Sequence, residues 1–154
     1  MLMINVEPSW WISPTWKFQQ GNPRPIIQRY LNQLGRKHNT HVVCDCHLDI
    51  QMKRLMLRGE QYPDAHLVIG VEDGAENGLN TKSLRDEWFS LTGNARIKVG
   101  YYDWSKEGEG NYCFSHYWLE PMIGCPHRSI CRRKGCKYRN NKIRIDKRNF
   151  KIPA

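Results

Sequence analysis

The sequence predicts an α+β fold in which helices cover one face of an antiparallel sheet. Several stretches alternate apolar and polar residues, the two-residue period of a strand. Two others carry apolar residues three and four positions apart, as amphipathic helices do. The predicted strands are 9–18, 40–50, 65–71 and 95–102, and the predicted helices are 23–34 and 81–91.

The first two elements are an aromatic strand and a helix. Trp10, Trp11 and Ile12 favour an extended segment, and Pro14 within it predicts a strand at a sheet edge, where a missing N–H is tolerated. Asn22 and Pro23 are suited to the helix start, and Gly35 with the polar residues Arg36-Lys37-His38-Asn39 is predicted to end the helix.

The next two strands each have two distinct faces. Val42, Cys44 and Cys46 alternate with Val43, Asp45 and His47, which predicts a core face and a solvated face. In the strand that follows, Asp64 and His66 lie two residues apart at its start and therefore point to the same face. Carboxylate and imidazole suit a divalent metal. The third ligand stays open among Asp45, His47, Glu60 and Glu72, and strand parity favours His47.

The later elements repeat the pattern. Thr81 is the expected cap of a helix that buries Leu84, Trp88 and Leu91 and stops at 92–94, and the strand 95–102 has a basic outer face. A third helix is predicted from Asn111 to about Glu120. The order β-α-β-β-α-β, followed by a helix, predicts a ferredoxin-like arrangement.

Positive charge is concentrated at the end of the chain. Between Arg128 and Lys151 there are eleven Lys/Arg and one acid, whereas the remaining 13 basic and 14 acidic residues nearly cancel. We therefore expect a domain at 1–121 and a basic, Cys-rich tail at 122–154 that either contacts nucleic-acid phosphates or only aids solubility. The candidate phosphate contacts are Arg128, Arg132, Arg133, Lys134, Lys137 and Arg139.

The cysteines predict a zinc site in this tail. Cys125, Cys131 and Cys136 lie within twelve positions and His127 is near the first, a ligand density typical of tetrahedral zinc. His127 is close to Cys125 for a shared metal, so Cys113 or His116 is an alternative fourth ligand. Free thiols on a tail are the other interpretation.

The sequence shows no run of apolar residues long enough to cross a membrane and no secretory signal at its N-terminus. Six cysteines in such a chain favour reduced thiols or metal ligands. The expected location is the cytoplasm, or the nucleoid or nucleus of a host cell if the protein is viral.

From Trp10 to Pro121 the chain resembles the HUH-type replication initiator and relaxase endonucleases of rolling-circle viruses, plasmids and transposons. The resemblance lies in the aromatic first strand, the segment Pro63-Asp64-Ala65-His66-Leu67-Val68-Ile69, and the segment Tyr112-Cys113-Phe114-Ser115-His116-Tyr117. Asp64 stands where the family has its first histidine, and Ser115 where it usually has a lysine.

The resemblance implies that Asp64 and His66, with His47, hold Mg²⁺ or Mn²⁺. It also implies that a tyrosine hydroxyl attacks a phosphodiester of single-stranded DNA, giving a 5′-phosphotyrosine and a free 3′-hydroxyl. Tyr112 is the favoured nucleophile because it begins the motif and shares a helix side with His116; Tyr117 is the alternative.

The expected function is therefore DNA nicking and joining that initiates replication or transposition. The alternatives are a non-catalytic, zinc-containing nucleic-acid-binding protein on the same fold, and an interaction protein in which zinc and aromatic residues serve only folding.

Overall fold

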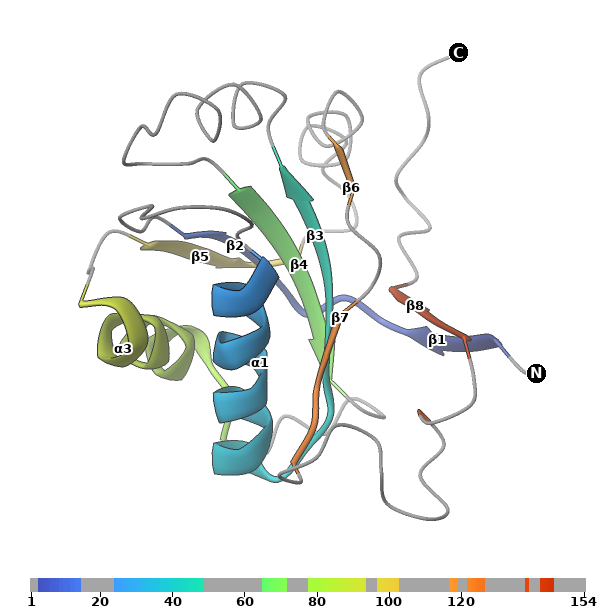
Figure 1. The fold of residues 1–154 in the computed structure, drawn as a ribbon, viewed down its shortest axis with the longest axis horizontal. Helices are drawn as coiled ribbons and strands as arrows, with labels where there is room; N and C mark the ends of the chain where they lie inside the picture. The colour runs from blue at the N-terminus through green and yellow to red at the C-terminus, as the bar shows by residue number, and fades with distance from the viewer. Residues whose placement is uncertain are drawn as a thin grey trace.

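A computed structural model of the chain describes residues 3–14, 24–48, 65–71, 78–93, 97–102, 117–118, 122–126, 138 and 142–145. Within these residues an antiparallel sheet runs in the order β5-β2-β4-β3-β6, and β7 pairs with β3 beside β6 (Figure 1). The strands of this sheet are β2 (Trp10–Pro14), β3 (Val42–Leu48), β4 (Ala65–Val71), β5 (Ile97–Tyr101), β6 (Tyr117–Trp118) and β7 (Met122–Gly124).

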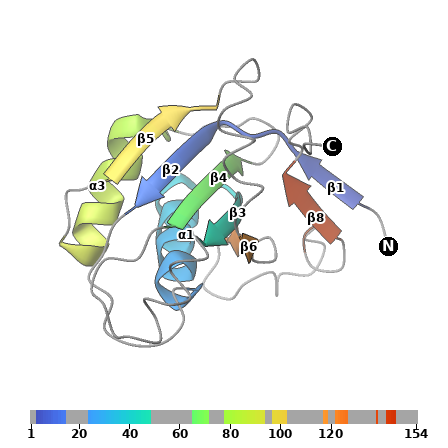
Figure 2. The same ribbon diagram turned by 90° about the horizontal axis from the view of Figure 1, so that it is seen from above.

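Two helices, α1 (Arg24–His38) and α3 (Thr81–Thr92), lie on the same face of the sheet (Figures 1 and 2). The buried hydroxyl of Tyr30 on α1 donates to the carbonyl of Leu84 on α3 at 2.7 Å. Lys37 and the largely buried Glu87 form an ion pair at 2.7 Å between the same helices. The two helices therefore form one layer, bound to each other as well as to the sheet.

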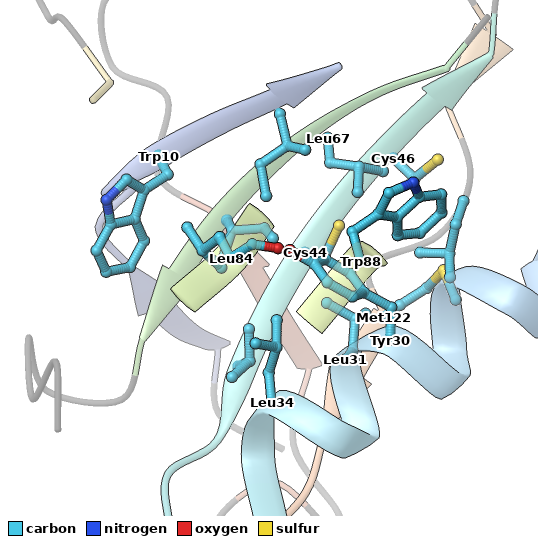
Figure 3. Close-up of a cluster of buried hydrophobic side chains, with 14 of the residues drawn as sticks. Trp10, Tyr30, Leu31, Leu34, Cys44, Cys46, Leu67, Leu84, Trp88 and Met122 are labelled. Atoms are coloured by element: carbon cyan, nitrogen blue, oxygen red, sulfur yellow. Dashed lines mark hydrogen bonds between the residues drawn. The ribbon is translucent and has the colours of Figure 1, made fainter. Parts of the chain in front are cut away.

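The main core lies between these helices and the sheet (Figure 3). Trp10, Tyr30 and Trp88 are fully buried in it, and the rings of Tyr30 and Trp88 meet edge to face with centroids 5.1 Å apart. Each buried side chain of this size contributes about 1.5–3 kcal/mol to folding. Cys44 and Cys46 are buried on the core face of β3, as the sequence predicts.

The second face of the sheet is also covered, over part of its length. Strands β1 (Met3–Val6) and β8 (Lys142–Ile145) form a parallel two-stranded ribbon on the side away from the helices (Figure 2). A smaller core there combines ribbon residues with sheet residues: Val6, Val43, Val68, Tyr102, Tyr138 and Ile145. The predicted solvated face of β3 is therefore wrong for Val43 and Asp45, which are 0% and 6% exposed.

The predictions for Pro14 and Gly35 are wrong. Pro14 does not mark an edge strand, because β2 lies between β5 and β4; the proline is its last residue, beyond the three residues paired with β4. Gly35 does not end α1, which continues to His38. A Cβ at Gly35 would lie 2.9 Å from the carbonyl carbon of Cys125, so this glycine allows the helix to touch the chain that follows β7.

The ends of α3 are close to those predicted. The cap is Asn80 and not Thr81: its side chain accepts from the N–H of Ser83, whose hydroxyl accepts from the N–H of Asn80, each at 2.8 Å. Gly93 ends the helix at φ 72°, and its N–H donates to Phe89. Within the described residues no helix has the length and apolar character needed to span a membrane.

The predicted helix from Asn111 to Glu120 is wrong at its C-terminal half. Tyr117 and Trp118 form β6, paired with Leu48 and His47 at the edge of β3. Aromatic residues fit strands well, and the edge of β3 offers unpaired backbone groups that a helix could not use. The preceding residues 111–116 lie outside the described residues. Beyond position 121, β7 joins the same sheet and Met122 is part of the main core.

Candidate functional site

The register of the sheet aligns several predicted site residues in one row. His66 of β4 is directly opposite His47 of β3, and His47 is opposite Trp118 of β6. On the other side of β4, the pairing of Ile12 with Leu67 brings Ser13 of β2 beside His66. Directly opposite residues of an antiparallel pair share a face and lie about 4.5–5.5 Å apart at Cβ. The row therefore places two histidine positions next to each other on the second face.

The hydrogen bond to Ser13 fixes the ring of His66. Its Nδ1 lies 2.9 Å from the hydroxyl oxygen of Ser13, and the histidine is half-buried. When an imidazole binds a metal through Nε2, its proton is on Nδ1. The Nδ1–H group then donates a hydrogen bond to the serine hydroxyl. The arrangement is thus suited to presenting Nε2 as a ligand. Strand parity in the sequence puts Ser13 on the face of Trp11, but only the register of β2 and β4 identifies His66 as its partner.

Asp45 stands one row further along the same face of β3. It is opposite Val68 and is 6% exposed, so its carboxylate belongs to the covered part of that face. The charge of Asp45 and burial together raise the pKa of the neighbouring Cys46 thiol, burial being the larger cause. Cys46 is therefore a buried core residue, as its alternation in the sequence predicts.

The backbone register separates the two residues of β6. Trp118 pairs with His47 and so belongs to the row of His66. Tyr117 pairs with Leu48, the next position of β3 after His47, and β6 lies at the edge of the sheet.

Several predicted residues lie outside the described residues. These are Asp64, Glu60 and Glu72 among the metal candidates; Tyr112 and His116 among the catalytic ones; Cys113, His127, Cys131 and Cys136 among the zinc candidates; and the basic residues Arg128, Arg132, Arg133, Lys134, Lys137 and Arg139.

Cys125 is the predicted zinc residue that the structure describes. It is 1% exposed, and its sulfur lies 3.6 Å from Nε2 of His41, itself 8% exposed. The ring of Tyr138 lies against that imidazole, with centroids 4.4 Å apart. His41 was not identified from sequence, because its neighbour comes from a strand about eighty positions later.

Among the described residues no three His, Cys, Asp or Glu side chains are grouped to hold a metal ion. Comparison of the chain with protein families, curated proteins and solved structures gives no match.

Proposed function

We propose that this protein is a metal-dependent endonuclease that nicks and rejoins single-stranded DNA through a tyrosine. The observation that carries the proposal is the pairing of His66 with His47 across β4 and β3, with Ser13 oriented to hold the ring of His66. Two adjacent histidines on one sheet face are a compact donor set, and Asp64 would add a carboxylate from the residue just before β4.

The arrangement of strands supports the same proposal. We infer a ferredoxin-like unit made of β2, α1, β3, β4, α3 and β5. In such a unit the last strand pairs with the first, and the third lies between the first and the second. The observed order β5-β2-β4-β3 agrees with that pattern, and both helices lie on one face. The site row then occupies the face of the sheet opposite the helices.

The proposed chemistry needs a cation and a nucleophile. A divalent ion held by Asp64, His66 and His47 would offset the negative charge that grows on the phosphate. The Tyr112 hydroxyl attacks phosphorus and loses its proton, the bond to the 3′ oxygen breaks, and that oxygen leaves as a hydroxyl once protonated. The 5′ phosphate stays on the tyrosine. Attack by a 3′-hydroxyl reverses the step, because the phosphotyrosine conserves the bond energy.

We favour Tyr112 over Tyr117 as the nucleophile because Tyr112 begins the motif that resembles the tyrosine motif of the endonuclease family. In this proposal His116 assists near the tyrosine, and the basic residues from Arg128 to Arg139 bind the backbone of the strand.

A covalent-adduct assay tests the proposal. A pool of random single-stranded DNA labelled at its 3′ ends is incubated with the full chain and Mn²⁺, then resolved on a denaturing protein gel. Label travelling with the protein is the expected result, because the downstream fragment stays on the tyrosine. Tyr112→Phe should abolish the adduct, and His66→Ala should reduce it at least about 100-fold.

The matched control is Tyr101→Phe, a change at an exposed tyrosine of β5 that should leave the adduct intact. An adduct that persists in Tyr112→Phe and disappears in Tyr117→Phe would reassign the nucleophile. DNA binding without any adduct, across the pool and with either Mn²⁺ or Mg²⁺, would reject the nuclease and leave the non-catalytic binding protein.

A further inference from the structure

Two buried side chains, His41 and Cys125, lie in contact at the Val42 end of β3, away from His66. Val42 pairs with Gly124 in the antiparallel register of β3 and β7. One step beyond that pair, His41 and Cys125 face each other. They contact at 3.6 Å between Nε2 and Sγ, and both are buried.

We propose that His41 and Cys125 are two ligands of a structural zinc ion at the junction of β3 and β7. Zinc lies about 2.3 Å from a thiolate sulfur and about 2.0–2.1 Å from an imidazole nitrogen, so two such ligands at a tetrahedral angle are about 3.5 Å apart. The observed 3.6 Å matches that edge of the tetrahedron.

The backbone around the pair is fixed closely by α1. Helix α1 ends at His38, Asn39 takes a left-handed φ of 50°, and the N–H of Thr40 donates to the carbonyl of Gly35 at 3.1 Å. This turn delivers His41 to the start of β3. Cys125 also contacts α1, at Gly35. A Cβ at Gly35 would lie 2.9 Å from the carbonyl carbon of Cys125.

A second contact pins Cys125. Gly124, the residue before it, approaches Leu31 so closely that a Cβ at Gly124 would clash with the Leu31 carbonyl oxygen. The amide of Gln28 donates to the carbonyl of Ile123 at 2.7 Å, again joining α1 to β7. Both ligands are therefore attached to α1, and a metal between them would find a preformed half-site.

The ring of His41 is also held from the far side. Tyr138 is 4% exposed and packs against the imidazole at 4.4 Å between centroids. Cys131 and Cys136, which the sequence predicts as zinc ligands, are the candidates for the other two corners.

The nitrogen ligand of this zinc site is His41, and not His127 as the sequence predicts. Zinc supplies the positive charge that a thiolate needs when it is buried to 1% exposure, as Cys125 is. A hydrogen bond between a neutral thiol and an imidazole has a similar distance. Measuring the zinc content of the protein distinguishes that hydrogen bond from a zinc site. The site lies at the end of β3 away from His66 and does not depend on the nuclease proposal.

Elemental analysis of the full chain is the first test. Protein purified without chelators, under reducing conditions, should carry about one zinc per chain. His41→Ala and Cys125→Ala should lower zinc affinity by more than the roughly 10- to 100-fold that loss of an outer-shell partner costs. Cys46→Ala, the matched control at a buried core thiol, should keep its zinc.

A second variant guards against loss of folding. His41→Cys retains four ligands but changes the donor set to four thiolates. With Co²⁺ in place of zinc, its visible absorption should shift toward that of a four-thiolate site while the metal content stays at about one. An unchanged cobalt spectrum in His41→Cys would overturn the proposal. Full zinc retention by either alanine variant, or no zinc in the parent protein after reconstitution, would do the same.

Discussion

Removing the hydroxyl of Ser13 tests whether His66 is an oriented metal ligand. Ser13→Ala deletes the oxygen that lies 2.9 Å from Nδ1 of His66. If Nε2 binds the metal, this oxygen accepts the Nδ1 proton and thereby fixes both the tautomer and the ring angle. Loss of such a partner typically weakens metal affinity about 10- to 100-fold, or about 1.4–2.7 kcal/mol. We expect the Kd for Mn²⁺ to rise by that factor.

Titration of the protein with Mn²⁺, with free ion followed by electron paramagnetic resonance, measures the change directly. The nicking rate gives an independent measure: the Mn²⁺ concentration for half-maximal rate should rise, while the rate at saturating Mn²⁺ changes little. Ser13→Thr keeps the hydroxyl and should recover most of the affinity.

The control is Ser83→Ala, which removes a hydroxyl of the same size from the cap of α3. It should lower stability and leave Mn²⁺ affinity unchanged. The reasoning fails if Ser13→Ala binds Mn²⁺ as tightly as the parent protein, or if Ser83→Ala loses as much affinity as Ser13→Ala.

Three further predictions concern packing and the core thiols. Gly124→Ala makes a Cβ clash with the Leu31 carbonyl oxygen and should lower the free energy of unfolding by at least about 3 kcal/mol in urea melts, whereas Gly93→Ala, with open space at φ 72°, should cost about 1–2 kcal/mol. Asn80→Ala removes the side-chain oxygen that accepts from the N–H of Ser83 and should cost about 1 kcal/mol in the same melts; no loss would contradict the cap. Because burial raises the pKa of Cys46, iodoacetamide should label it only after denaturation, and labelling of the native protein at neutral pH would contradict its position in the core.

Local periodicity was sufficient where an element packs through one face. The strand 65–71 is β4 as predicted, and Leu84 and Trp88 are buried on α3 as their helical spacing indicates. The alternation of β3 also separated its faces correctly, with Cys44 and Cys46 in the main core. These features depend on near neighbours in the sequence, which a pattern can record.

The failures share a different cause, which is a partner distant along the chain. Asp45 is buried because the β1–β8 ribbon covers part of the second face, and nothing near Asp45 in the sequence signals that ribbon. Gly35 continues α1 because β7 approaches it from about ninety positions later. Tyr117 and Trp118 form a strand because they pair with the free backbone groups at the edge of β3. In each case a distant segment of the chain that packs against the residue decided its structure, and local secondary-structure propensity alone did not.

The same non-local pairing organises the two proposed metal sites at opposite ends of one strand. His41 directly precedes β3 and His47 lies six residues later near its end, about 20 Å away at strand spacing. At one end, imidazole meets a cysteine thiol in a buried corner, a soft donor set that suits zinc. At the other end, imidazole lies in a half-buried row with a carboxylate expected nearby, a harder donor set open to an exchangeable Mn²⁺ or Mg²⁺. Under the two proposals, the ligand chemistry would place a structural ion at the end of β3 that α1 contacts and a catalytic ion at the end that carries His47.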